Sequence, residues 1–148
     1  MNILGFDYPD SLYYLLERDM WVQPLDAGLV RIGMTAFGVR ISGHFFMCRP
    51  KPVGTEIVQG ATLAVAELNK AVVTIKSPVS GRVLETNALL VDQPELIERD
   101  PYGLAWLVMM QANCWQDDLA QLAHGPALRQ QAERRMRLEN LDFSLGPA

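Results

Sequence analysis

The sequence predicts a mainly β protein, a compact β-sandwich or barrel with helices at its ends. From position 21 to about 110, short stretches rich in Val, Ile, Thr, Phe and Leu alternate with turn residues roughly every ten positions. A short helical pattern precedes this strand region, a second interrupts it near residues 93–99, and further helical patterns follow it. Together the three observations place a β core between helical ends.

The bulk properties fit one globular domain and argue against several classes of function. With 148 residues, 49% of them hydrophobic, one domain buries roughly 68–70% of its unfolded surface. The net charge of −4 argues against wrapping nucleic acid or an anionic membrane. No apolar run approaches the ~18–20 residues of a membrane span, and the N-terminal MNILGFDYPDSL shows no signal peptide. We therefore expect a cytoplasmic protein.

The first element expected is a short N-terminal helix in the stretch PDSLYYLLERDMW. Asp10 or Ser11 has a side chain that suits the N-cap position. Leu12, Leu15 and Leu16 follow at helical spacing. We expect this helix to cover one edge of the core.

The strand region contains one tight hairpin with a lysine at its tip. The strands TLAVAEL (62–68) and AVVTIK (71–76) are separated only by Asn69 and Lys70. Two-residue hairpin loops favour Asn-Gly or Asp-Gly, because a type I′ turn needs positive φ at both central residues. Lysine is common at exposed tips, but it is an unusual choice for such a turn. The spacing alone therefore raises a functional role for Lys70 without naming it.

The next helix is predicted over residues 92–101, DQPELIERDP. Asp92 and Glu95 have the spacing of a capping box, and Pro94 falls in the first turn, where its missing N–H does no harm. Asp100 precedes a proline and so ends the helix. The following AWLVMM (105–110) is apolar enough for a return strand buried on both faces.

Two helices are predicted after Asn113. WQDDLAQLAH is the first, ended by Gly125, and Pro126 starts the second. The second helix carries one apolar stripe that we expect to pack against the sandwich, formed by Leu128, Ala132 and Met136. It is also locally basic, through Arg129, Arg134, Arg135 and Arg137. A docking patch for an acidic partner is one interpretation; a solvated face with a Glu133–Arg137 pair is the one we favour.

Catalytic or metal-binding patterns are lacking in the sequence. Cys48 and Cys114 lie 66 positions apart, and His44 lies four residues before Cys48. A Cys–His pair for thiol chemistry is possible there, but a small buried thiol near a solvated imidazole is the more ordinary interpretation. Nothing resembles a Ser/His/Asp arrangement, a phosphate-binding Gly-rich loop or a metal ligand set. The sequence does not predict an enzyme.

The stretch SPVSGRVLETNALLVDQPELIERDPYGLAWLV (77–108) resembles the glycine cleavage system H protein family. The residues that carry the resemblance are Ser77, Pro78, Ser80, Gly81, Asn87, Pro94, Glu95, Asp100, Pro101, Tyr102, Gly103, Trp106 and Leu107. The family's E-x-x-K-A motif is matched by Glu67, Lys70 and Ala71. The resemblance covers about residues 12–124.

The resemblance implies a lipoyl-type β-sandwich, or barrel-sandwich hybrid, in which Lys70 carries lipoate in amide linkage. It implies a single carrier domain over 1–148, with an H-protein-like core at about 12–124 and a C-terminal helical extension at 125–148. The chemistry would belong to the cofactor, and the protein would be a non-catalytic carrier. The implied partners include a lipoate ligase or lipoyl transferase and dihydrolipoamide dehydrogenase. Biotin carriers share this fold but place the lysine between methionines, which Asn69 and Ala71 do not match.

The sequence departs from the family where the lipoyl arm is expected to lie. Met20 stands where the family has the glutamate of a His-Glu-Trp motif, and MCRPKPVG brings Arg49 and Lys51 where the family is acidic. We therefore expect Met20, Cys48, Arg49 and Lys51 to face the arm. A thioether is only a weak acceptor and carries no charge.

These departures favour a sulfur-containing cargo over the family's aminomethyl cation. In this respect the chain resembles the H-protein-like lipoate-binding proteins of cytoplasmic, heterodisulfide-reductase-like sulfur oxidation. The predicted function is a lipoamide on Lys70 that shuttles a sulfur intermediate between enzymes of such a complex. The alternative is a glycine cleavage H protein that carries the aminomethyl group from glycine decarboxylase to aminomethyltransferase.

Overall fold

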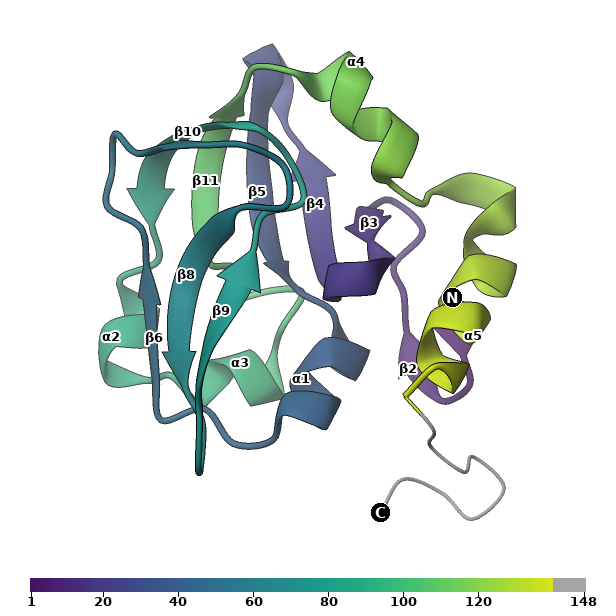
Figure 1. The fold of residues 1–148 in the computed structure, drawn as a ribbon, viewed down its shortest axis with the longest axis horizontal. Helices are drawn as coiled ribbons and strands as arrows, with labels where there is room; N and C mark the ends of the chain where they lie inside the picture. The colour runs from purple at the N-terminus through teal and green to yellow at the C-terminus, as the bar shows by residue number, and fades with distance from the viewer. Residues whose placement is uncertain (140–148) are drawn as a thin grey trace.

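The computed structural model describes residues 1–139 and shows two antiparallel sheets packed face to face, with a third, two-stranded sheet and helices around them (Figure 1). The expected mainly β sandwich with C-terminal helices is confirmed. The strands are β1 (Asn2–Ile3), β2 (Phe6–Asp7), β3 (Tyr13–Leu15), β4 (Met20–Pro24), β5 (Leu29–Met34), β6 (Met47–Pro50), β7 (Glu56–Ile57), β8 (Thr62–Glu67), β9 (Val72–Lys76), β10 (Gly81–Thr86) and β11 (Val108–Ala112). The α-helices are α1 (Ala36–Ser42), α2 (Leu89–Asp92), α3 (Leu96–Arg99), α4 (Trp115–Asp118) and α5 (Leu128–Arg137), and the 3-10 turns are η1 (Leu16–Arg18), η2 (Asp26–Gly28), η3 (Leu119–Gln121) and η4 (Gly125–Ala127).

The larger sheet has six strands in the order β3-β4-β5-β11-β10-β7, and the smaller has three in the order β6-β8-β9. Strand β11 comes late in the chain but lies between β5 and β10, pairing Val108 with Ile32 and Met110 with Val83. The smaller sheet is built on the β8–β9 hairpin, and β9 forms one of its edges.

The main core lies between the two sheets. Its fully buried members alternate along the strands, as expected for sheets with one face inward. They come from both sheets and from the short helices, and include Met20, Val22, Ile32, Leu63, Ala66, Val83, Leu90, Ile97, Leu107 and Met110.

A second core lies on the other side of the larger sheet. It joins the β1–β2 hairpin, α1 and α5 through Ile3, Tyr8, Tyr14, Trp21, Phe37, Leu128, Ala132 and Met136. The predicted stripe of α5 is therefore buried as expected, and it packs on the outer face of the sandwich rather than on the core between the sheets. Helix α5 thus contacts the first third of the chain (Figure 1).

The expected N-terminal helix is wrong. Tyr13–Leu15 is strand β3, paired with β4 through Tyr14↔Trp21, and only Leu16–Arg18 forms a 3-10 turn. The other edge of β3 is also used, because Tyr14 N donates to Ala123 O (2.9 Å) and Ala123 N donates to Tyr14 O (2.8 Å). Backbone pairing on both sides outweighs the helical spacing of the leucines, since local propensity is a weak prior.

Helix α1 lies where the sequence predicted only strands. Its N-cap is Thr35, whose Oγ1 accepts from Gly38 N at 3.1 Å, and it ends at Gly43, where φ is 90°. Further on, the predicted capping box is wrong: Asp92 ends α2, and α3 begins at Leu96 with no side-chain cap.

Two later elements differ in extent from the prediction. Residues 115–121 form α4 and η3 rather than one helix over 115–124, and the return strand β11 runs over Val108–Ala112 instead of 105–110. Among residues 1–139, no helix combines the length and apolar character that crossing a bilayer requires.

Candidate functional site

The tip of the β8–β9 hairpin is a tight turn that demands no special residue. Glu67 pairs with Val72, and Leu68 N donates to Ala71 O at 2.8 Å. In the described part of the chain, the non-glycine residues with positive φ are Leu4, Asp19 and Ala27. Asn69 and Lys70 are not among them, so the turn is not of type I′, and the mismatch of Lys70 with such a turn does not arise. A turn with negative φ at both centres accepts lysine without strain.

Lys70 projects from this tip into solvent. Its side chain is exposed, and within residues 1–139 it makes no hydrogen bond or ion pair. Of the other two lysines, Lys76 Nζ donates to Thr62 Oγ1 at 3.1 Å. Lys51, just after strand β6, is exposed and its amine is likewise unpaired within residues 1–139, so the hairpin tip and its motif distinguish Lys70. Glu67 and Ala71 are exposed beside Lys70. The tip therefore offers one unengaged amine, with both residues of the E-x-x-K-A motif accessible around it.

A cleft of about 230 Å³ lies beside β9, the strand that leads away from this tip. Its walls are η1 and the start of β4 on one side, α1 on another, and β9 itself. The lining residues are Glu17, Arg18, Asp19, Met20, Met34, Gly38, Ser42, Val73, Thr74, Ile75 and Lys76. The cleft begins at Val73, three residues from Lys70, which is about 10 Å along a strand.

Asp19, the residue directly before strand β4, has an unusual backbone conformation. Its backbone is left-handed, with φ 57° and ψ 42°, and its carbonyl accepts from Thr35 N at 2.9 Å. Its Oδ2 accepts from Arg135 Nη2 of α5 at 2.7 Å. Its Oδ1 is buried and has no hydrogen-bond partner among the described residues. Burial raises the pKa of the Asp19 carboxyl to about 6, against the opposing pull of Arg135.

The four residues predicted to face the arm are not brought together. Met20 is fully buried and lines the cleft. Cys48, Arg49 and Lys51 lie on or just after β6, which is the opposite edge of the smaller sheet from β9, and none of them lines the cleft. Whether these three face the arm stays a prediction.

Cys48 shows no sign of thiol chemistry. Its thiol is buried, and this burial raises its pKa to about 12, so it stays protonated at neutral pH. His44 is not its partner, because His44 Nδ1 lies 2.6 Å from Glu98 Oε1. This agrees with the more ordinary of the two interpretations offered by the sequence.

The charges of the cleft differ from those expected of a site that has lost its carboxylates. Glu17 and Asp19 line it, together with Arg18 and Lys76. Sequence reasoning missed Asp19 and Arg135, because their contact joins residues 116 positions apart. The left-handed conformation of Asp19 could not be predicted from the neighbouring residues either. The one hint in the sequence is that aspartate tolerates this conformation.

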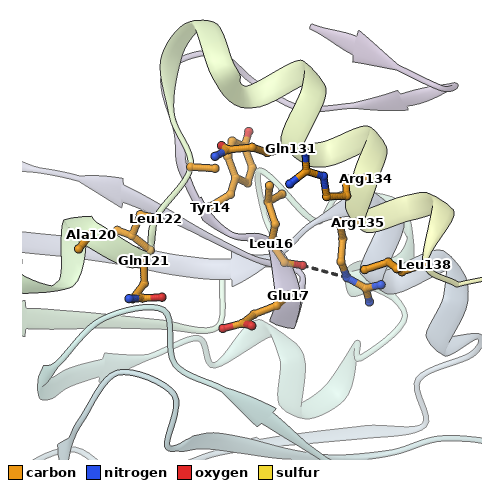
Figure 2. Close-up of a pocket in the computed structure, with 11 residues that line it drawn as sticks. Tyr14, Leu16, Glu17, Ala120, Gln121, Leu122, Gln131, Arg134, Arg135 and Leu138 are labelled. Atoms are coloured by element: carbon orange, nitrogen blue, oxygen red, sulfur yellow. Dashed lines mark hydrogen bonds between the residues drawn. The ribbon is translucent and has the colours of Figure 1, made fainter.

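A larger groove of about 540 Å³ separates α5 from the segment that leads into it (Figure 2). It is lined by Tyr14, Leu16, Glu17, Ala120, Gln121, Leu122, Ala123, Gln131, Arg134, Arg135 and Leu138. Figure 2 shows Arg135 reaching from α5 to the carbonyl of Leu16, to which its Nε donates at 3.0 Å. Arg135 therefore lines this groove and also binds Asp19, which lines the cleft.

Comparisons with known proteins agree on one family. The model of the family "Glycine cleavage H-protein" matches residues 12–135, which extends the resemblance seen in the sequence from position 124 into α5. A glycine cleavage system H protein 3 of Aquifex aeolicus is 33% identical over 131 residues, covering 86% of this chain and 81% of that protein. A probable glycine cleavage system H protein of Pyrococcus abyssi is 37% identical over 113 residues, covering 76% and 83%.

The fold agrees as well. The crystal structure of a glycine cleavage system H protein from Mycobacterium marinum superposes with a TM-score of 0.71 at 26% identity, over 90% of this chain and 100% of that one. Together with the exposed lysine of the hairpin tip, these matches lead to one conclusion: the chain belongs to the glycine cleavage H-protein family.

Proposed function

We propose that this chain is a lipoyl carrier whose attachment residue is Lys70. Proteins of the family carry lipoate covalently on a lysine and are not themselves catalysts. The observation that carries the assignment is the exposed, unengaged Lys70 amine at the hairpin tip, within residues 1–139. An amide-linked group fits there, because forming the amide breaks no contact of the fold.

The residues around Lys70 suit a modifying enzyme. Glu67 and Ala71 are exposed on the same tip, so a lipoate ligase or lipoyl transferase meets the motif without displacing packed side chains. When bound, lipoate supplies a dithiolane that undergoes thiol–disulfide exchange. The chain itself supplies a rigid two-strand base, which holds the attached group at a high local concentration for partner enzymes.

The cargo proposed is the aminomethyl group derived from glycine. The support is the family match and the naming of the relatives as glycine cleavage proteins. The partners are then glycine decarboxylase, aminomethyltransferase and dihydrolipoamide dehydrogenase. The carboxylates of Glu17 and Asp19 in the cleft beside β9 suit a cationic cargo.

A sulfur cargo is the second candidate, favoured by two features of the cleft lining. Met20 lines the cleft at the position where the family has a glutamate, and Arg18 and Lys76 bring positive charge to the same cleft. Under this alternative, lipoamide on Lys70 would serve a heterodisulfide-reductase-like sulfur-oxidising complex.

The attachment is tested by mass spectrometry after incubation with lipoate and a lipoate ligase. We expect one lipoyl group per chain, located on Lys70 by peptide mapping and abolished in Lys70→Arg. Lys76→Arg is the matched control, because Lys76 lies on the same hairpin but donates to Thr62; it should be modified like the wild type. Modification of Lys70→Arg at the wild-type level would refute the assignment.

The cargo is tested with the lipoylated chain. Offered to glycine decarboxylase with glycine, it should take up the glycine-derived carbon, followed with labelled glycine. An established glycine cleavage H protein serves as the positive control. If the control loads and the lipoylated chain does not, the glycine cargo is excluded and the sulfur alternative is favoured.

A further inference from the structure

The smaller sheet leaves one of its two faces uncovered. Alternation along its strands sends Cys48, Ala66 and Ile75 into the core between the sheets. The side chains that alternate with them lie on the outer face, where each is exposed or half-exposed: Met47, Arg49, Val65, Glu67, Val72 and Thr74. Since none of the six is buried, no element within residues 1–139 covers this face.

The strand register places the outer face directly beside Lys70. Met47, Glu67 and Val72 form one row across the three strands, because Met47 pairs with Glu67 and Glu67 pairs with Val72. Neighbouring strands lie about 4.8 Å apart, so this row is about 10 Å wide. Val72 follows Lys70 by two positions and is 68% exposed. The next row away from the tip consists of Arg49, Val65 and Thr74.

The outer face is more basic than the chain as a whole. It carries Arg49, and it is bordered by Lys51, which directly follows β6, and by Lys76, which ends β9. Glu67 is the one acidic residue in the three strands. The chain itself has a net charge of −4. A partner surface that combines apolar side chains with carboxylates therefore complements this face.

The chemistry of attachment decides which enzyme has to meet this face. The nitrogen of Lys70 bonds to the carbonyl carbon of lipoate that ATP has activated as an acyl adenylate, the bond to AMP breaks, and the nitrogen releases its excess protons to the solvent. Reacting atoms must approach to about 3–3.5 Å, so the attaching enzyme must bring its active site to the tip itself. Enzymes that act on the far end of the attached arm can stand off from the tip by the length of the arm.

We propose that the outer face of the β6-β8-β9 sheet is the docking surface for the enzyme that lipoylates Lys70, and that this enzyme presents apolar and acidic side chains to it. Met47 and Val72 supply the apolar contact, and Arg49 supplies the charge. The inference rests on the proposed function and adds to it the side from which the enzyme approaches, set in part by β6, a strand outside the motif around Lys70.

The test follows the lipoylation of the full chain by a lipoate ligase with ATP and lipoate, using mass spectrometry over time to obtain kcat/KM. Arg49→Glu should lower kcat/KM at least about tenfold, because it sets like charges against each other in the contact. The matched control is Arg82→Glu, which alters an exposed arginine of β10 in the larger sheet; it should react like the wild type. Rising ionic strength should slow the wild type and should slow Arg49→Gln less.

A second pair of variants tests the apolar contact. Val72→Ser should lower kcat/KM about fivefold, as expected when an apolar side chain of a docking surface is truncated. Val58→Ser is its matched control, because Val58 is 67% exposed and lies just after β7, outside the face; it should react like the wild type. All of these positions are exposed, so the variants should unfold at the same urea concentration as the wild type.

The inference fails if Arg49→Glu and Val72→Ser are lipoylated at the wild-type rate, or if the two controls are slowed as much as they are. A wild-type dimer that Arg49→Glu dissociates, measured by light scattering, would show that the face binds a second copy of the chain and would also overturn it. A wild type that is not modified at Lys70 would overturn the proposed function together with this inference. Modification of Lys70 at rates that no variant changes would overturn the docking surface alone.

Discussion

The hairpin tip and the corner formed by Asp19 and Arg135 are built in opposite ways. Lys70 is exposed and, within residues 1–139, contacts no hydrogen-bond partner. Arg135 makes hydrogen bonds to three different residues, and Asp19 is held in a left-handed conformation against Gly38. The tip is free of the fold, whereas the corner is fixed by it.

The difference separates two requirements of a carrier. A tethered group needs an attachment point that a modifying enzyme can reach and whose loss leaves the fold intact. The fold, in turn, needs its buried charges to be held by their partners, as the carboxylate of Asp19 is by Arg135. Substitutions at the tip should therefore change modification without stability, and substitutions at the corner should change stability first.

The largest expected effect is that of Arg135→Met. It leaves the Asp19 carboxylate buried without its partner, and breaking such a pair costs about 3 kcal/mol of unfolding free energy. Urea denaturation measures the loss. Arg134→Met is the control, because Arg134 is the exposed neighbour on the same helix; it should change the unfolding free energy by less than about 0.5 kcal/mol. Equal effects of the two would remove the distinction drawn for the corner.

The next effect is a pH dependence that arises from Asp19. Its pKa is about 6 in the folded protein, because of burial, against 3.8 for an unperturbed aspartate. The folded state therefore binds this proton more tightly than the unfolded state does, so this contribution to stability is present below pH 4 and is lost as the pH rises to about 6.

Relative to Asp19→Asn, the unfolding free energy of the wild type should fall by about 2 kcal/mol between pH 4 and pH 7. Denaturation curves of the two proteins at both pH values give this difference directly. A rise, or no change, would show that the carboxyl is not desolvated as described.

A smaller loss is expected for Tyr102→Phe. The Tyr102 hydroxyl accepts from Ala36 N (3.1 Å) and donates to Asp7 O (2.6 Å), so it ties the start of α1 to β2. Its removal should cost about 1.5 kcal/mol of unfolding free energy. Tyr13→Phe is the control: the hydroxyl of Tyr13 has no hydrogen bond among residues 1–139, and the cost there should be close to zero.

The smallest effect on stability is expected at the tip. Lys70→Gln removes an exposed side chain with no partner within the described residues, so the unfolding free energy should change by less than about 0.5 kcal/mol. The same variant should accept no lipoyl group. A large loss of stability here would mean that the lysine has a structural role and would weaken the contrast with the corner.

The sequence predicted the tip far better than the corner, for a physical reason. The alternation of β8 and β9, the two residues between them and the motif around Lys70 are all local, and local patterns are what a sequence displays. The contact of Asp19 with Arg135 spans 116 positions and has no such pattern. The stripe of α5 was predicted from its period, but the surface it covers was not.

Two errors in the N-terminal part of the chain have a related origin. The leucines of the first segment have helical spacing, yet Tyr13–Leu15 is a strand because β4 and Ala123 pair with its two edges. Helix α1 was missed because Thr35 acts as an N-cap only when the residues after it are helical, so the threonine alone does not predict a helix. Both conformations have partners distant in the sequence: Ala123 pairs with β3, and the hydroxyl of Tyr102 accepts from Ala36 N at the start of α1.

The negative φ of Asn69 and Lys70 has a consequence for how the sequence of the tip can change in evolution. Such a turn tolerates almost any pair of side chains, so folding exerts no selection on position 70. Under the proposed function, the requirement for a lysine there comes from outside the chain, from the enzyme that modifies it. The scaffold could therefore lose its tether in a single mutational step and still fold.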